Sequence, residues 1–233
     1  MNGAKVKAHE RFSGVYWVRL REGATRLATL SIAPGKASYR EKIIESGRNQ
    51  YRIWNPFHSK LAAAVMRGLN LFPVRQGQKV LYLGAATGTT VSHMSDIVEA
   101  SGRIFCIEFA QRTIRELMNN VSTHRPNMAP ILADARFPEN YRMMVEQVDG
   151  VYCDIAQPEQ AKALADNSEM FLKRDGWAIL VVKASSVDVT KNPKDVFDSE
   201  IKELEKRGFV TAAQTSLEPY DKAHVLAVAF YKG

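Results

Sequence analysis

Cysteine is scarce in this chain, since only Cys106 and Cys153 occur among its 233 residues. Two cysteines cannot form the dense disulfide framework of a small secreted domain, and a reducing compartment suits them. Neither has a histidine or another cysteine at metal-ligand spacing, which argues against a zinc site. Both lie inside apolar runs, so we expect two buried thiols in the core.

Long apolar runs are also missing. None approaches the roughly 20 residues that a membrane-spanning helix needs. The basic first segment, MNGAKVKAHERFSG, is not followed by the apolar stretch of a signal peptide. Hydrophobic residues make up 45% of the chain and charged residues 24%, which is the balance of a folded protein and not of a disordered one. We therefore expect a soluble protein inside the cell.

Acidic residues are outnumbered: 25 Asp and Glu stand against 32 Lys and Arg, which gives a net charge of +7. A basic balance attracts polyanions such as RNA over long range, but it does not indicate a fold. The charge therefore supports a nucleic-acid partner only together with a matching site.

The pattern of apolar residues divides the chain into two parts. Residues 1–55 contain short, partly alternating runs, which predicts a small antiparallel β domain; turn residues separate the runs at Ser13-Gly14, Glu22-Gly23 and Pro34-Gly35. Residues 56–233 begin with a helix expected from His58 to Leu69. From Lys79 onward, short apolar strands alternate with helices, which predicts βαβ units in a parallel sheet.

The last two predicted strands, 209–220 and 224–233, follow each other without a helix between them. They should pair antiparallel at one edge of the sheet. The predicted fold class is therefore α/β, with a Rossmann-like, mostly parallel seven-stranded sheet, an antiparallel edge hairpin and a small antiparallel β domain in front of it.

A glycine-rich turn, LGAATGTT, follows the first strand of the second part. Such small residues let the backbone approach a ligand beside the N-terminus of the next helix. A triphosphate site would need lysine directly after Gly88, where Thr89 stands. A dinucleotide site would need glycine at Ala86, because that glycine lets the backbone close on a pyrophosphate. The turn therefore favours an adenosyl group without phosphates, as in S-adenosylmethionine.

Acidic residues stand at the ends of the second, third and fourth strands of this part, at Glu108, Asp134 and Asp154. An acid about 20 residues after the glycine-rich turn accepts hydrogen bonds from ribose hydroxyls, which fits Glu108. Asp134 is placed to meet an adenine amino group, and Asp154 ends the strand beside the point where the strand order reverses. Each acid alone is also explained as a helix N-cap. The three together favour a ligand site.

The segments NPFHSKLA, VLYLGAATGTTVSHMSDIV, CIEFAQR, ILADARFPENY, VDGVYCDIAQPEQ, LVVKASSVD and LEPYDKAHVLAVAFYK make the chain resemble the fibrillarin family over nearly its whole length. The resemblance implies a class I methyltransferase fold that uses S-adenosyl-L-methionine. It also implies methylation of ribose 2′-oxygens in rRNA and possibly tRNA, as the catalytic subunit of a box C/D ribonucleoprotein. The implied partners are a Nop5/Nop56/58-type scaffold protein, an L7Ae-type RNA-binding protein, a guide RNA and the target RNA.

Eukaryotic members of this family carry a Gly/Arg-rich N-terminal extension, which this chain lacks. The chain therefore resembles the archaeal form, for which we expect a cytoplasmic location. At the matching positions, the resemblance implies cofactor contacts from Gly84, Ala85, Thr89, Thr90, Glu108, Phe109, Asp134, Ala135, Asp154 and Gln157.

Many ribose 2′-O-methyltransferases use a Lys–Asp–Lys group with a fourth polar residue, which Lys60, Asp154, Lys183 and His224 match. Asp154 and Lys183 end neighbouring strands, and two flanking cations favour the charged form of Asp154. Lys183 interrupts an apolar run, so it should face a cleft and contact the 2′-oxygen, either as a proton acceptor or as a stabiliser of negative charge. Taken alone, Lys60 could be a solvent-exposed lysine of a helix, and His224 could be a residue at the edge of the sheet without a catalytic role.

Other readings stay open at this point. A similar enzyme could methylate a protein glutamine or a small molecule, and a structural subunit could retain a vestigial cofactor pocket. The apolar residues of the first 55 positions are a candidate docking face. RNA contacts are expected from basic and aromatic residues, which could instead pack the small domain against the large one: Arg48, Tyr51, Arg52, Trp54 and Arg136.

Overall fold

Five short strands form the first sheet of the computed structural model, which describes residues 5–188 and 190–233. All neighbours in this sheet are antiparallel, in the order β1-β2-β3-β5-β4, so the predicted antiparallel β region is confirmed. The bounds are β1 Lys5–Ala8, β2 Val15–Arg19, β3 Thr25–Leu30, β4 Ile43–Ser46 and β5 Asn49–Ile53.

Seven strands form the second sheet, in the order β11-β12-β10-β9-β6-β7-β8. The five strands from β6 to β10 run parallel, and β12 pairs antiparallel with both β10 and β11, which confirms the predicted fold class. The bounds are β6 Lys79–Leu83, β7 Arg103–Glu108, β8 Met128–Leu132, β9 Val148–Cys153, β10 Leu172–Lys183, β11 Phe209–Ser216 and β12 His224–Tyr231.

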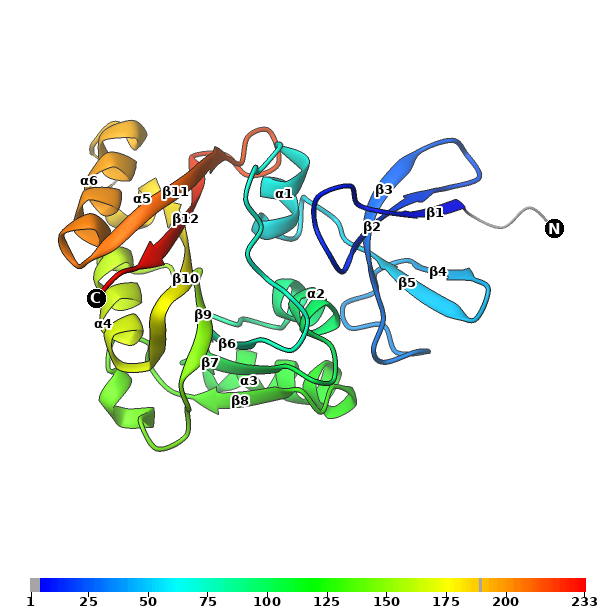
Figure 1. Ribbon diagram of the computed structural model, residues 1–233, viewed down its shortest axis with the longest axis horizontal. Helices are drawn as coiled ribbons and strands as arrows, with labels where there is room; N and C mark the ends of the chain where they lie inside the picture. Colours follow the sequence, from blue (N-terminus) through cyan, green and yellow to red (C-terminus); the bar gives the residue numbers. More distant parts are fainter. Residues whose placement is uncertain (1–4, 189) are drawn as a thin grey trace.

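Helices cover both faces of the second sheet (Figure 1). Side chains alternate along β6, so Val80 and Tyr82 pack toward α1, α2 and α3, whereas Leu81 and Leu83 pack toward α4 and α6. The bounds are α1 Lys60–Met66, α2 Thr89–Val98, α3 Gln111–Asn120, α4 Gln160–Phe171, α5 Ala184–Val187 and α6 Pro193–Lys206, with short 3-10 turns η1 Ser122–His124 and η2 Pro138–Tyr141.

The first helix is shorter than the predicted range from His58 to Leu69. Ser59 is its N-cap and accepts a hydrogen bond from the Ala62 amide, and Gly68 leaves the helix with φ +85°. The cap fixes where the helix begins and makes Lys60 its first residue. We propose residues 1–55 and 56–233 as the two domains; residues 1–4 lie outside the described part of the chain.

Both cysteines are fully buried in the core, as predicted. Burial raises the pKa of the Cys106 thiol to about 12 and that of Cys153 further, so both stay protonated. Among the described residues, no helix is both long and apolar enough to cross a membrane.

A buried ion-pair network joins the first sheet to α2. The Asp96 carboxylate accepts hydrogen bonds from Arg52 Nη1 at 2.7 Å and from Arg125 Nη1 at 2.6 Å, and the Thr29 hydroxyl donates to it at 2.7 Å. The side chains of all three charged residues are at most 1% exposed. Arg52 also donates to Glu41 at 2.6 Å, so the network extends toward the β3–β4 connection.

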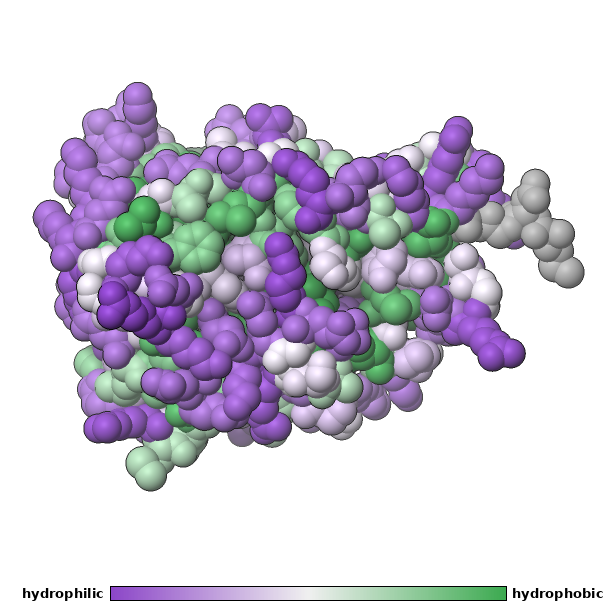
Figure 2. All heavy atoms as spheres, in the orientation of Figure 1, coloured by the Kyte–Doolittle hydropathy of each residue, from purple (hydrophilic) through white to green (hydrophobic). Residues whose placement is uncertain are grey.

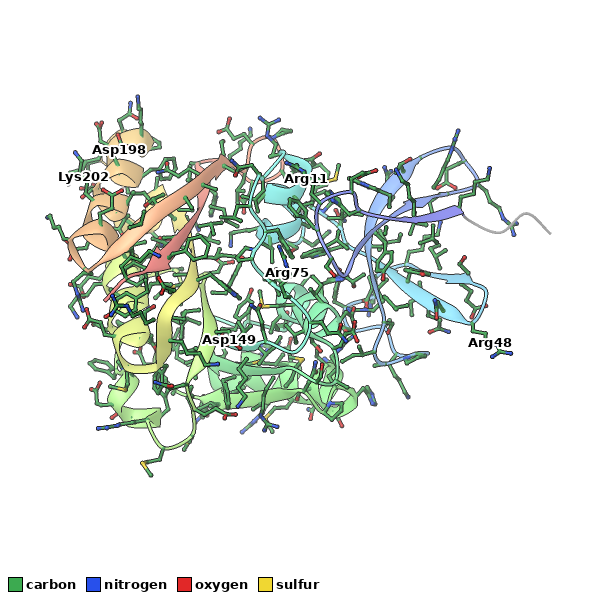
Figure 3. The ribbon with its side chains drawn as sticks, in the orientation of Figure 1. Arg11, Arg48, Arg75, Asp149, Asp198 and Lys202 are labelled. Carbon is green, nitrogen blue, oxygen red and sulfur yellow. The ribbon has the colours of Figure 1, made fainter. Side chains whose placement is uncertain are left out.

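Of the five residues expected either to contact RNA or to pack the small domain against the large one, three are packed inside the protein. Arg52 and Trp54 are fully buried and Tyr51 is 8% exposed, because they pack between the sheets or inside the first sheet. Arg48 is exposed at the β4–β5 turn (Figure 3), and Arg136 is bound to the neighbouring Asp134.

The docking face at the first sheet stays a prediction. Several apolar residues of the sheet are only half-buried: Val6, Tyr16, Leu30, Ile44 and Ile53. Val18 and Ala28 are fully buried and Leu20 is 8% exposed, since they form a small core with Tyr51. Within residues 5–188 and 190–233, the large apolar side chains that stay exposed lie outside β1–β5. Most of them lie at the end of β8, on either side of η2 or in α4: Leu132, Phe137, Met143, Met144 and Met170. In Figure 2, hydrophilic residues dominate the outline around α6.

His93 gives the interface between the first sheet and α2 a predictable pH dependence. Its buried ring stacks on Trp54, and its nitrogens lie 2.7 Å from the Thr29 hydroxyl and 2.5 Å from the Tyr39 hydroxyl. Burial, and then the charges of Arg52 and Arg125, hold the pKa of His93 well below 6.5. As the pH falls below about 6.5, His93 therefore takes up a proton in the unfolded chain but not in the folded protein.

We expect this group to lower the free energy of unfolding by about 1.4 kcal/mol for each pH unit below about 6.5. Urea unfolding between pH 7.5 and 5 measures that slope. A His93→Gln variant should show a shallower slope than the wild type, whereas His124→Gln, at an exposed site, should not. Equal slopes for wild type and His93→Gln would contradict the assignment.

Candidate active site

A cavity of about 250 Å³ lies at the carboxyl ends of β6, β7, β8 and β9. Strands β6 and β9 are neighbours here although they are not consecutive, so the strand order reverses at this point, where doubly wound sheets bind ligands. The lining residues are Gly84, Ala86, Ile107, Glu108, Phe109, Ala133, Asp134, Ala135, Asp154, Ile155, Ala156 and Gln157.

Gly84 lets the ends of β6 and β9 approach each other. Its φ is +81°, and a Cβ at this position would stand 2.4 Å from the carbonyl oxygen of Asp154. That neighbour is backbone and cannot rotate away, so only glycine fits. The Asp154 amide donates to the Leu83 carbonyl at 3.0 Å, which holds Asp154 beside the glycine-rich turn.

Glu108 connects the glycine-rich turn to the end of β7. Its Oε2 accepts from the Ala86 amide and its Oε1 from the Ala110 amide, both at 2.9 Å, and the residue is 7% exposed. A carboxylate accepts about four hydrogen bonds, so capacity for hydroxyl donors remains at the cavity. The neighbouring Phe109 is 66% exposed and offers an aromatic face there.

Asp134 lines the cavity and forms an ion pair with Arg136, whose Nη2 lies 2.6 Å from Oδ2. The hydrogen bonds from Arg136 lower the pKa of Asp134, which is therefore charged at neutral pH. Sequence alone did not indicate this pairing, which gives Arg136 a place beside the cavity.

Three of the residues expected to bind the cofactor do not line this cavity. Ala85 is buried, and Thr89 and Thr90 begin α2. The Thr90 hydroxyl donates to Ser59 Oγ at 3.0 Å, so it supports the start of α1. Sequence reasoning also missed five lining residues, although each lies close in sequence to a predicted one: Ala86, Ile107, Ala133, Ile155 and Ala156.

Lys60 and Asp154 form an ion pair across 94 residues of chain. Lys60 Nζ donates to both carboxylate oxygens of Asp154, at 2.8 and 2.9 Å. The two side chains are 26% and 21% exposed, so water screens the pair only in part. A lysine that could have faced solvent is thus brought to the edge of the cavity by the capped start of α1.

Lys183 and His224 are cross-strand partners in the β10–β12 pair. Strand β10 also pairs with β9, which ends just before Asp154, so all four predicted catalytic residues lie at one edge of the sheet. His224 is 6% exposed, and its Nδ1 donates to the Lys222 carbonyl at 2.7 Å and lies 2.9 Å from Asp221 Oδ1. These acceptors place the ring proton on Nδ1.

A seven-stranded sheet of this order, with a cavity at the reversal point, defines the class I S-adenosylmethionine-dependent methyltransferase fold. The Fibrillarin family model matches residues 6–233. The chain belongs to the fibrillarin family.

Known relatives resemble the chain over nearly their full length. A Staphylothermus marinus protein named fibrillarin-like rRNA/tRNA 2′-O-methyltransferase is 50% identical over 227 residues, 97% of each chain. Aeropyrum pernix fibrillarin, solved with natively bound S-adenosyl-L-methionine, has a TM-score of 0.92 at 46% identity and covers 98% of this chain and 99% of its own. A fibrillarin/Nop5p complex gives a TM-score of 0.85 at 38% identity, covering 97% and 100%.

Proposed function

We propose that the chain is an S-adenosylmethionine-dependent RNA methyltransferase that modifies the ribose 2′-oxygen of rRNA and tRNA. Relatives about 50% identical over nearly the whole chain carry this activity in their names. The observation that carries the proposal is the Lys60–Asp154 ion pair, which lies beside the cavity and one strand away from Lys183.

The residues at the cavity fit S-adenosyl-L-methionine. Glu108 is a fixed carboxylate for the ribose hydroxyls, and the exposed ring of Phe109 is available for the adenine. Asp134 would meet the adenine amino group beside its partner Arg136. The amino-acid end would lie over the glycine-rich turn at Gly84, and Ala135, Asp154 and Gln157 line the same cavity. Ala85, Thr89 and Thr90 stay in the proposed set because of their places in that turn and at the start of α2, although they do not line the cavity.

When bound, the cofactor supplies a methyl group that its sulfonium already activates. A ribose hydroxyl is a poor nucleophile, so the protein must align it and favour loss of its proton. Lys60 holds the Asp154 carboxylate. Lys183 ends the strand next to the one that leads to Asp154, so its side chain would reach the 2′-oxygen from the same edge of the sheet. As a neutral amine, Lys183 would accept the hydroxyl proton; as an ammonium, it would stabilise the developing negative charge, and the buried His224 would support it from the next strand.

The proposed complex is a box C/D ribonucleoprotein in which a guide RNA selects the target nucleotide. A Nop5-type scaffold is supported by the fibrillarin/Nop5p structure, and an L7Ae-type protein completes the assembly. We also propose a cytoplasmic location, which the archaeal relatives support.

Transfer of a radiolabelled methyl group tests this function. The chain is reconstituted with guide RNA, scaffold protein and L7Ae-type protein, and is offered target RNA and a glutamine-containing protein substrate. Label should enter the RNA and depend on the guide. Label in the protein substrate alone would overturn the proposal.

Glu108→Gln should weaken cofactor binding about 10- to 100-fold, or about 1.4–2.7 kcal/mol. Glutamine keeps the shape of the side chain but carries no charge. Its NH₂ group would also face one of the two backbone N–H groups, of Ala86 and Ala110, that now donate to Glu108. Calorimetric titration with S-adenosylmethionine measures the effect, and Glu139→Gln, at an exposed site on η2, serves as the control. An unchanged Kd would remove Glu108 from the cofactor site.

A further inference from the structure

A second cavity, of about 550 Å³, lies between the first sheet and the segment that leads into α1. Residues from β3, the β3–β4 connection, the stretch from the end of β5 to the start of α1, the end of α1 and the β11–β12 connection line it. We call this cavity the interdomain groove. The lining residues with charged or aromatic side chains used below are Arg26, Arg40, Lys42, Phe57, His58 and Tyr220.

The interdomain groove adjoins two segments that carry proposed catalytic residues. Phe57 stands three positions before Lys60, and Tyr220 four positions before His224. Their rings meet edge to face with centroids 5.1 Å apart, so the two segments touch at the groove (Figure 1). A chain molecule bound in the groove would therefore continue toward the catalytic edge of the sheet.

The groove is positively charged where it meets water. Arg26, Arg40 and Lys42 are exposed. The acidic residue in the lining, Glu41, has a side chain only 1% exposed and is neutralised by Arg52 at 2.6 Å. Arg40 is also held at φ +66°, a conformation that non-glycine residues rarely adopt. The surface thus presents three cations to a partner, which suits a polyanion.

The groove also offers aromatic surface next to these cations. Phe57 is 66% exposed, so much of its ring is open to a partner. Exposed aromatic rings beside arginine and lysine are the combination with which proteins bind single-stranded RNA, by stacking bases and pairing with phosphates.

We propose that the interdomain groove binds the target RNA strand beside the nucleotide that is methylated. This proposal rests on the proposed function, and it replaces the buried residues that sequence reasoning had assigned to RNA. The phosphates contact Arg26, Arg40 and Lys42, and a base stacks on Phe57. Binding here leads the neighbouring ribose to Lys60 and Lys183.

A charge-reversal pair tests the groove in the reconstituted complex. Arg40→Glu with Lys42→Glu should raise the KM for target RNA at least tenfold with kcat nearly unchanged. The slope of log(kcat/KM) against log[salt] should also become less negative by about 1.4, because each lost contact with a phosphate of a single strand changes that slope by about 0.7. Phe57→Ala should raise the KM about 5- to 100-fold.

The matched control is Lys194→Glu with Lys202→Glu, the same charge change at exposed sites on α6, at the other end of the molecule from the first sheet (Figure 3). This control should keep the wild-type KM and salt slope. Cofactor affinity, measured by calorimetry, should be the same in all variants, because none of these residues lines the cofactor cavity.

An unchanged KM for target RNA in the groove variants would overturn the proposal. An equal rise in KM in the groove pair and in the α6 pair would overturn it as well. Loss of scaffold binding by the groove pair would identify the groove as a protein contact and would also overturn it. If the wild-type complex methylates no RNA, the proposed function itself fails. If the wild-type complex methylates RNA and the groove variants have the wild-type KM, only the groove assignment fails.

Discussion

Lys183→Ala should lower the single-turnover rate of methyl transfer by about 10²- to 10⁴-fold, the range for removing a positioned proton-transfer group. Lys183 ends β10 next to the strand that leads to Asp154, and it is the cross-strand partner of His224. It does not line the cofactor cavity, so cofactor affinity should stay within about twofold. Rapid-quench transfer and calorimetry on the same preparation measure both quantities.

Two further variants sharpen this prediction. Lys202→Ala removes an exposed lysine from α6 and should leave the rate unchanged. Lys183→Arg keeps the positive charge but cannot accept a proton at neutral pH. Substantial activity in Lys183→Arg would identify charge stabilisation as the role of Lys183, and loss of activity would identify proton acceptance. Wild-type transfer by Lys183→Ala would remove Lys183 from the catalytic group.

Asp96→Ala should lower the free energy of unfolding by about 3–5 kcal/mol. The carboxylate accepts hydrogen bonds from Arg52, Arg125, the Thr29 hydroxyl and the Ile32 amide, all in the contact between the first sheet and α2. Its removal leaves two guanidinium groups buried with fewer partners, a costlier state than either a paired or an apolar interior.

Chemical denaturation measures this loss, and a fall in Tm of roughly 6–20 °C should accompany it. Asp198→Asn is the matched control, because Asp198 is exposed on α6 (Figure 3) and should change stability by less than about 0.5 kcal/mol. A loss below about 1 kcal/mol for Asp96→Ala would show that the network adds little to stability.

The sequence predicted the second sheet well because its strands are short apolar runs with clear helices between them. It also predicted why distant residues meet: parallel strands end at one edge, so Glu108, Asp134 and Asp154 all reach the same cavity. The ion pair between Lys60 and Asp154 follows from the same rule and the cap at Ser59.

Pairing between distant charges could not be predicted in this way. Arg52 looked like an RNA contact because nothing in its local pattern indicates Asp96, which lies 44 residues away and neutralises it inside the protein. The sequence likewise did not indicate that the Thr90 hydroxyl donates to Ser59 in the segment before α1. The interdomain groove was missed because its lining comes from five separate segments, none with a motif of its own.

The most direct test of the central claim is to map the methyl group that the reconstituted complex transfers. Target RNA is digested to nucleosides, and mass spectrometry identifies the modified atom and its position. The arrangement of Lys60, Asp154 and Lys183 predicts a single 2′-O-methylated ribose at the guide-selected nucleotide. A methyl group on a base, or one whose position ignores the guide, would contradict it.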